Sequence, residues 1–276
     1  IKMYVSVAVM DTGIFRHMDF DTRIAGFADF VGRKKYLYDD NGHGTHVAGI
    51  IAGSGKGSNG KYRGIAPDTF LVSVKVLDKS GNGKIENVVE AAGWIIENKS
   101  AMNIRVVNIS FGTRAKMENG PAIETGEDDY ALIMAVEKMW DSGIVVVAAA
   151  GNNGPGNTSV TAPGISKKII TVGAFDDKNF FSGRGPTREC IVKPEVVVTG
   201  SNIIACNNRQ GRYSSKSGTS MAAPVVSGAV ARLIKNNPDI TPKEVKIWMK
   251  SCCKKINVPS EKQGWGVLDI RKFVTG

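Results

Sequence analysis

The chain has 276 residues, of which 42% are hydrophobic and 22% are charged, a composition typical of a soluble globular protein. Its net charge of +10 is scattered along the sequence without a run of five or six like charges, so we expect no nucleic-acid partner. No apolar stretch approaches the roughly 20 residues that a bilayer span requires, so we expect no membrane segment either.

Short apolar runs rich in β-branched residues recur along the chain. They are continuous and do not alternate with polar residues, which indicates strands buried on both faces. Taken in order, the predicted strands cover residues 5–9, 71–77, 104–110, 144–150, 169–175 and 196–200.

Helical periodicity separates several of these runs. A glycine-bracketed turn leads into an apolar helix within 41–53, and further helices are predicted over 84–99, 130–143, 219–237 and 241–250. Gly143 suits the carboxyl end of the helix before it. In the last helix, Thr241, Pro242 and Glu244 form the pattern of a capping box.

The alternation of strands and helices predicts an α/β fold. We expect a three-layer, mostly parallel, doubly wound sheet with helices on both faces, in a single domain covering residues 1–276. The longest irregular stretch, 112–130, is expected to be a surface excursion.

The four cysteines, Cys190, Cys206, Cys252 and Cys253, match neither zinc spacing nor a dense disulfide framework. We expect free thiols packed as small hydrophobes, which favours a reducing compartment such as the cytoplasm. The sequence begins at Ile1 and not at a methionine, so export stays open.

Three reactive side chains lie where open parallel sheets place their functional groups, between a strand end and the following helix. Asp11 follows the first strand, His43 stands in "NGHGTHVAGIIAG", and Ser220 begins the long helix in "SGTSMAAPVVSG". Each segment alone is consistent with a turn or a helix start. Together, in the order Asp, His, Ser, they match the order of the subtilisin triad.

These motifs, with "VVNISFG" and "VVVAAAGNNG", resemble the motif set of the subtilisin-like serine proteases, the subtilases. The resemblance covers nearly the whole chain. It implies a serine endopeptidase in which Ser220 is the nucleophile, His43 the general base and Asp11 the residue that orients His43. It also implies that Asn152, which alone would be taken for a turn residue, donates to the oxyanion.

The same resemblance predicts how a polypeptide substrate binds, namely extended between "SFG" and the loop 78–83. The expected substrate-binding residues are Ser110, Phe111, Gly112, Ala149, Ala150, Gly151 and Thr219. The loop 157–164 is expected to form the floor of the S1 pocket. Of the other histidines, His46 is expected to pack with a hydrogen-bonded ring, and His17 to lie on the surface or in a loop.

The chain departs from secreted subtilisins at the stretch 53–67, which is rich in glycine and lysine and lacks carboxylates where those enzymes carry a calcium loop. Asp19 matches one calcium ligand, but we expect the site to be lost and no cofactor to be needed for catalysis. These features resemble the intracellular-type bacterial subtilases more closely. An inhibitory propeptide stays open as a further partner.

Three alternative functions fit the sequence less well. An aspartic protease would pair Asp11 with Asp141, but Asp141 ends a predicted helix and does not follow a strand. A zinc hydrolase built on "HGTH" lacks the glutamate of the HExxH motif. A catalytically inactive subtilase acting as a scaffold would have lost part of the triad, which is complete here.

Overall fold

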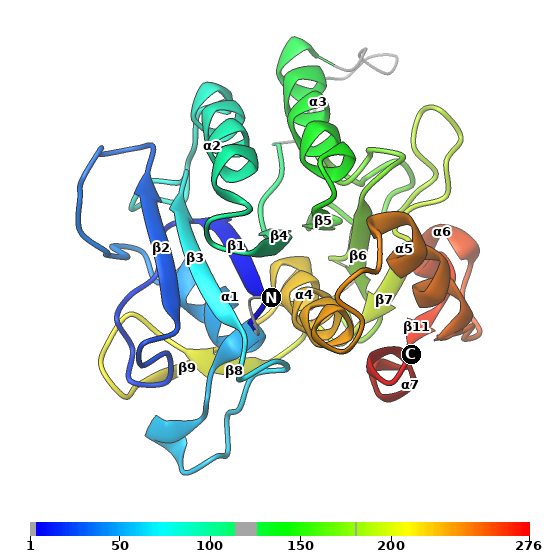
Figure 1. Ribbon diagram of the computed structural model, residues 1–276. Helices are drawn as coiled ribbons and strands as arrows, with labels where there is room; N and C mark the ends of the chain where they lie inside the picture. The colour runs from blue at the N-terminus through cyan, green and yellow to red at the C-terminus, as the bar shows by residue number, and fades with distance from the viewer. Residues whose placement is uncertain (1–3, 114–125, 180) are drawn as a thin grey trace.

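The computed structural model describes residues 4–113, 126–179 and 181–276. Its main sheet has the strand order β10-β11-β7-β6-β5-β4-β1-β3-β2 (Figure 1). All neighbouring pairs are parallel except β10 with β11. The strands are β1 (Ser6–Asp11), β2 (Ile24–Asp29), β3 (Phe70–Lys75), β4 (Ile104–Ile109), β5 (Val145–Ala149), β6 (Ile170–Ala174), β7 (Val196–Val198), β10 (Cys253–Lys254) and β11 (Val267–Leu268).

All six predicted strands are confirmed. The additional ones have weak sequence signals, because β10 and β11 are two residues long and β2 is a partly exposed edge strand interrupted by Gly26. A separate antiparallel hairpin, β8 (Ile203–Cys206) with β9 (Tyr213–Lys216), was also not predicted. It packs on the helix that carries His43.

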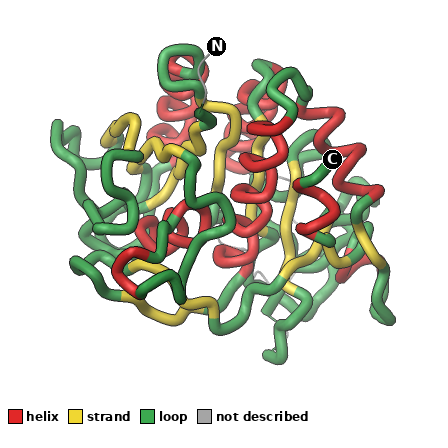
Figure 2. The backbone as a smooth tube through the Cα atoms, turned by 60° about the horizontal axis from the view of Figure 1, so that its bottom comes forward, coloured by secondary structure: helices red, strands yellow, loops and turns green. Residues whose placement is uncertain are grey.

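Helices cover both faces of the sheet, as Figures 1 and 2 show. Those described are α1 (His43–Ala52), α2 (Ile85–Asn98), α3 (Glu127–Asp141), α4 (Thr219–Asn236), α5 (Pro242–Ser251), α6 (Ser260–Gln263) and α7 (Ile270–Val274), with a 3₁₀ turn at Lys56–Ser58. None of them is long and apolar enough to cross a membrane.

Two hydrophobic clusters fill the space between the layers, and β1 contributes to both. Val7 and Val9 pack on the side of α1 and α4, whereas Ala8 and Met10 pack on the side of α2 and α3. This division is what a continuous apolar strand predicts, and it confirms the three-layer arrangement.

The predicted helix ends are largely confirmed. The capping box of Thr241 and Glu244 is formed, and α3 is followed by Gly143 with a φ of 91°, a left-handed conformation that glycine adopts readily. Helix α3 begins at Glu127, three residues before the predicted start. Most of the expected excursion over 112–130 lies outside the described residues.

Candidate active site

Asp11 is the last residue of β1, at the carboxyl edge of the sheet. After β1 the chain forms β2 and β3 on one side of it and then crosses to β4 on the other, so the strand order switches direction at β1. Open α/β sheets bind ligands at the carboxyl ends of strands beside such a switch point. The Asp11 carboxylate is fully buried there.

His43, the first residue of α1, faces this carboxylate. Its Nδ1 lies 2.8 Å from Asp11 Oδ1 and 2.9 Å from Oδ2, and Asp11 Oδ1 also accepts the Thr12 N–H at 2.7 Å. Burial lowers the pKa of His43, but the charge and hydrogen bond of Asp11 outweigh it, and the pKa is raised above the ordinary value. The contact therefore fixes the ring and favours its protonated form.

Close packing of α1 on β1 makes this contact possible. A Cβ placed on Gly44 would lie 2.1 Å from the Gly13 carbonyl oxygen, so only glycine fits next to His43. The buried Asp39 carboxylate accepts the Gly42 N–H at 2.8 Å and the Thr45 N–H at 3.0 Å. It thereby satisfies amides at the start of the helix that have no partner within it.

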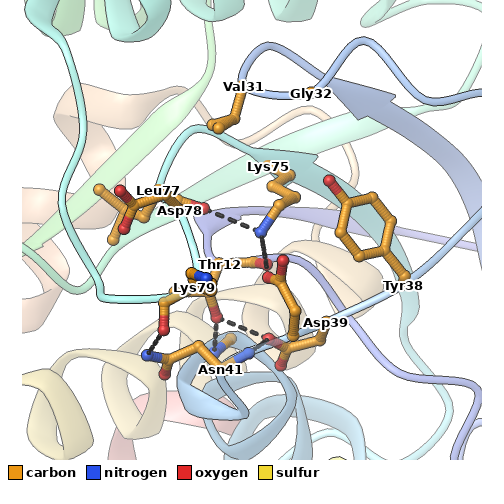
Figure 3. Close-up of polar contacts among 12 residues, drawn as sticks. Thr12, Val31, Gly32, Tyr38, Asp39, Asn41, Lys75, Leu77, Asp78 and Lys79 are labelled. Carbon is orange, nitrogen blue, oxygen red and sulfur yellow. Dashed lines mark hydrogen bonds and ion pairs between the residues drawn. The ribbon is translucent and has the colours of Figure 1, made fainter.

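Lys75 joins the neighbouring loops to the same edge of the sheet (Figure 3). This side chain is buried at the end of β3, in register with Asp11. Its ammonium group donates to the Thr12 carbonyl at 2.6 Å, the Leu77 carbonyl at 2.9 Å and the Asp40 carboxylate at 2.7 Å. The start of the predicted substrate-binding loop 78–83 is thus tied to the residue after Asp11.

Ser220 lies in the first turn of α4, whose leading N–H groups have no intrahelical acceptors. Its hydroxyl donates to the Ser110 carbonyl at 2.8 Å, and the Ser110 hydroxyl donates in return to the Ser220 carbonyl at 3.0 Å. The second bond has a cause in the sequence, because Pro224, four residues on, cannot donate to that carbonyl within the helix.

The structure places Asp11, His43 and Ser220 on adjacent elements. Asp11 and His43 are hydrogen-bonded to each other, whereas the Ser220 hydroxyl has a different partner. In the described part of the chain, the Ser220 hydroxyl is hydrogen-bonded to Ser110 and not to His43. Loose nucleophile–base geometry is common in enzymes without substrate.

A polar chain behind Ser220 was missed by the sequence analysis. Asn108 in β4 donates to the Ser110 hydroxyl at 2.8 Å and accepts from the Ser227 hydroxyl of α4, also at 2.8 Å. These side chains are buried, so their bonds fix α4 against β4. The sequence signal for this polar chain is Asn108, a polar residue inside the apolar run "VVNIS".

Asn152 stands over the amino end of α4. Its Oδ1 accepts the Thr219 N–H at 3.0 Å and the Thr219 hydroxyl at 3.1 Å. With the oxygen held in this way, the Nδ2 group carries the side-chain donors for a bound ligand. Asn152 and the start of α4 together form an electropositive corner next to Ser220.

A pocket of about 500 Å³ opens beside Ser220. Four of the predicted substrate-binding residues line it: Phe111, Gly112, Ala149 and Gly151. Of the other three, Ser110 bonds to Ser220, Ala150 is fully buried, and the Thr219 hydroxyl accepts the Gly151 N–H at 3.1 Å.

Thr161, from the predicted floor segment 157–164, also lines the pocket. Its hydroxyl is buried and has no hydrogen-bond partner among the residues that the structure describes. A Cβ on Gly112 would lie 2.3 Å from this oxygen, so residue 112 in the pocket wall must be a glycine. The Thr161 hydroxyl is therefore a polar group on the pocket floor that is available to a bound ligand.

Comparison with known proteins identifies the family. The model of the subtilase family, Peptidase S8, matches residues 3–266. The chain belongs to the subtilase family. Within it, the chain is 43% identical over 274 residues to the serine protease AprX of Bacillus subtilis, covering 90% of this chain and 60% of AprX. It is 35% identical to subtilisin DY of Bacillus licheniformis, covering 88% and 81%.

Solved structures give the same result. A cold-adapted subtilisin-like serine proteinase superimposes with a TM-score of 0.76 at 30% identity, covering 97% of this chain and 88% of that chain. Sphericase superimposes with a TM-score of 0.80 at 26% identity, covering 96% and 90%. These neighbours confirm the predicted subtilisin-like fold.

The rival sites are not assembled in this subtilase. Asp141 ends α3 before β5 begins, and its carboxylate is exposed and pairs with Lys168 at 2.7 Å. Because β1 and β5 run in the same direction, Asp141 and Asp11 lie at opposite edges of the sheet. His46 turns away from His43 towards β8 and β9.

His46 packs as predicted. Its Nε2 lies 2.9 Å from the Ser214 carbonyl and 3.2 Å from that of Ile203, so it carries the ring proton. Nδ1 is buried and has no partner in the described part of the chain. Burial lowers the pKa of His46 to about 4. The unfolded chain, with a histidine pKa near 6.5, therefore binds more protons than the folded one between these values.

Stability should consequently fall as the pH drops from about 6.5 to about 4, by roughly 3 kcal/mol from this group. A glutamine at position 46 can donate to the same carbonyls but does not titrate. In urea unfolding of Ser220→Ala protein, which removes the proposed nucleophile and so prevents autolysis, His46→Gln should flatten this pH dependence. Parallel curves with and without His46→Gln would contradict the assignment.

His17 was expected on the surface or in a loop, and it lies in a loop but is buried. Its Nδ1 accepts the Asp19 N–H at 3.1 Å, and its Nε2 lies 3.1 Å from the Arg212 carbonyl. The ring packs edge-on to Tyr213 with centroids 5.4 Å apart. With Asp19 and Cys206 it forms a group whose ligand atoms lie within 4.8 Å of one another.

This group does not fit a calcium ion. The Asp19 carboxylate accepts the Gly55 N–H at 3.0 Å, the Gly57 N–H at 2.8 Å and the Tyr213 hydroxyl at 2.9 Å. Calcium needs several oxygen ligands, whereas these neighbours direct hydrogens at the carboxylate. Asp19 instead holds the loop around residues 55–57 by direct hydrogen bonds.

The structure joins none of the four cysteines in a disulfide. Cys206 and Cys252 are buried and Cys253 is half-buried, as expected for thiols that pack as small hydrophobes. Cys190 is exposed, which corrects that expectation for this residue. It lies in an irregular segment with a φ of 59°.

Proposed function

We propose that the chain is a serine endopeptidase that hydrolyses peptide bonds of polypeptides through an acyl-enzyme intermediate. The observation that carries the proposal is the bond between Asp11 and His43 beside Ser220, at the mouth of a pocket. Membership of the subtilase family supports the same reaction. The catalytic roles are assigned to Asp11, His43, Ser220 and Asn152.

In this mechanism, Ser220 turns from Ser110 towards His43, which takes its proton as the oxygen attacks the scissile carbonyl. Asp11 keeps the Nδ1–H of His43 in place and stabilises the imidazolium. The oxyanion receives hydrogen bonds from Asn152 Nδ2 and the Ser220 N–H at the positive end of α4. His43 then protonates the leaving amine, and water releases the acyl group by the reverse sequence.

The substrate is proposed to bind as an extended strand beside residues 111–113. The small side chains of Ala149, Gly151 and Gly112 leave room for a sizeable P1 group, and the unpartnered Thr161 hydroxyl lies at its end. We assign the chain to the intracellular-type subtilases, which is supported by the hydrogen-bonded loop at Asp19 and the free thiols. Catalysis is proposed to need no cofactor.

Inhibitors test the reaction class. Casein hydrolysis should be abolished by a sulfonyl fluoride such as PMSF, with one added group on the peptide that contains Ser220. EDTA should leave the activity unchanged, since no metal takes part in the proposed mechanism. Activity that survives the sulfonyl fluoride, or that is lost in EDTA, would contradict the proposal.

The pH dependence tests the base. His43 must be neutral to accept a proton, and Asp11 raises its pKa, so kcat/KM for a peptide ester should fall as the pH drops through a value above about 6.5. Initial rates between pH 5 and 9 measure this limb. A flat profile between pH 5 and 8 would exclude a histidine base.

A further inference from the structure

The ammonium group of Lys75 is a buried charge whose donors all have acceptors. Only 1% of the side chain is exposed, and its nitrogen donates to the carbonyls of Thr12 and Leu77 and to the carboxylate of Asp40. An ammonium group has three N–H donors, so these three acceptors use all of them. Burial of a charge is costly, so the Lys75 side chain depends on all three acceptors staying in place.

Three loops at the carboxyl edge of the sheet supply these acceptors. Thr12 follows β1, Leu77 follows β3, and Asp40 precedes α1. Figure 3 shows the Lys75 side chain between the segments of Thr12 and Leu77. Because β3 and β4 are the two neighbours of β1, the loop after β3 and the residues 111–113 after β4 flank the end of β1. Lys75 therefore joins the end of β1 to one flank of the proposed substrate site.

One arm of this network leads to the start of α1. Lys75 holds the Thr12 carbonyl at 2.6 Å. The Thr12 hydroxyl donates to the Asp39 carboxylate at 2.9 Å and accepts the Gly44 N–H at 3.0 Å, and the Thr12 N–H donates to the Asp11 carboxylate at 2.7 Å. Movement of Thr12 would therefore shift the Asp11 carboxylate relative to α1, whose first residue is the proposed base.

The other arm leads to the loop 78–83, which is the predicted substrate loop. Lys75 holds the Leu77 carbonyl, directly before this loop, at 2.9 Å. The loop closes on itself, because the Asp78 carboxylate accepts the Asn82 N–H at 2.9 Å and the Asn82 carbonyl accepts the Asp78 N–H at 2.8 Å. A loop closed in this way moves as a unit, so the position of its first residue sets the position of the whole.

We propose that Lys75 is a positioning residue that links the substrate loop to the Asp11–His43 pair, an inference that rests on the function proposed above. Residues 111–113 line the pocket for the P1 group, so a peptide strand between them and the substrate loop is the acyl part of the substrate. Binding energy from such remote residues accelerates a reaction when it orients the reacting groups. Through Lys75, substrates that are longer on the acyl side gain in kcat and not only in KM.

Lys75→Met tests the proposal, because methionine has nearly the same length but carries no charge and no donor. Two substrates are compared, succinyl-Leu-p-nitroanilide and succinyl-Ala-Ala-Pro-Leu-p-nitroanilide, which is longer by three residues on the acyl side. In the parent protein, kcat should be higher for the long substrate. In Lys75→Met the ratio of the two kcat values should fall about tenfold, whereas KM should stay lower for the long substrate.

Lys34→Met is the matched control. Lys34 is exposed, and its ammonium lies over the Tyr38 ring at 4.2 Å from the centroid, while that of Lys75 lies 4.9 Å from the same centroid. This variant should keep the parent ratio. An equal loss of kcat on both substrates, an unchanged ratio, a parent kcat that does not depend on length, or the same fall in Lys34→Met would overturn the proposal. A parent protein that hydrolyses neither the anilides nor casein would overturn the proposed function, and this inference with it.

Asp40→Ala decides the question if Lys75→Met does not fold. The Asp40 side chain is 41% exposed, so its truncation should be tolerated, and it removes one of the three acceptors of Lys75. A lower kcat ratio in Asp40→Ala, with a short-substrate kcat near that of the parent protein, supports the positioning role. A ratio equal to that of the parent protein overturns it.

Discussion

Replacement of Ser220 by alanine is expected to reduce kcat on casein or a peptide ester by about 10⁶-fold, the order of loss known for the nucleophile of subtilisin itself. The physical reason is that the proposed mechanism forms the acyl-enzyme on the Ser220 hydroxyl, which alanine lacks. The residual rate should come from the oxyanion donors and from substrate binding. Steady-state kinetics with active-site titration of the parent protein provides the measurement.

The variant should stay folded, because alanine is well tolerated in a helix and the deleted hydroxyl makes one hydrogen bond, to Ser110. Ser251→Ala is a suitable control, since Ser251 is exposed at the end of α5 and its hydroxyl bonds within that helix. Equal turnover by parent protein and Ser220→Ala would remove Ser220 as nucleophile. It would favour a non-catalytic role for this subtilase.

Asp11→Asn is expected to reduce kcat by about 10⁴-fold without unfolding the protein. The asparagine can keep the shape of the buried site but cannot hold the Nδ1–H of His43 as the carboxylate does at 2.8 Å. A second effect distinguishes the loss of the Asp11 charge from a structural disruption of the site. Without the Asp11 charge, burial of His43 dominates, and the acid limb of the residual activity should move to lower pH.

Asp141→Asn provides the matched control, because it removes the carboxylate that an aspartic protease would pair with Asp11. Asp141 is exposed and paired with Lys168, so the expected loss is small. An equal loss in Asp11→Asn and Asp141→Asn would revive the carboxylate-dyad hypothesis. An unshifted acid limb in Asp11→Asn would show that Asp11 does not set the pKa of His43.

The central strands and long helices were predictable because burial on both faces leaves a clear local pattern. Every residue of β1 is buried, and the run "VSVAV" at residues 5–9 is of the kind that predicts a strand buried on both faces. Strand β2 and the hairpin β8–β9 were not predictable, since they are partly exposed and their pairing depends on partners that are distant in sequence. Periodicity carries no information about such contacts.

For the site, the residue types and their order indicated Asp11, His43 and Ser220, and the structure brings Asp11 and His43 into contact. The sequence did not reveal Lys75, Asn108 or Ser227, because a single polar residue in an apolar run does not disclose its partner. Ala150 and Thr219 were predicted to bind substrate, and both are fully buried. Side-chain direction at strand ends was the missing information.

The position of Ser220 on α4 has a consequence for how the molecule loses activity. Most of α4 is buried, and it packs against β1, β4, β5, β6, β7, α1 and α7. Because the helix cannot detach without exposing the core, the hydrogen-bonded amide protons in the interior of α4 should exchange with solvent only through global opening. The proposed nucleophile is then held in place as long as the molecule is folded, and activity should disappear in the same cooperative transition as the fold.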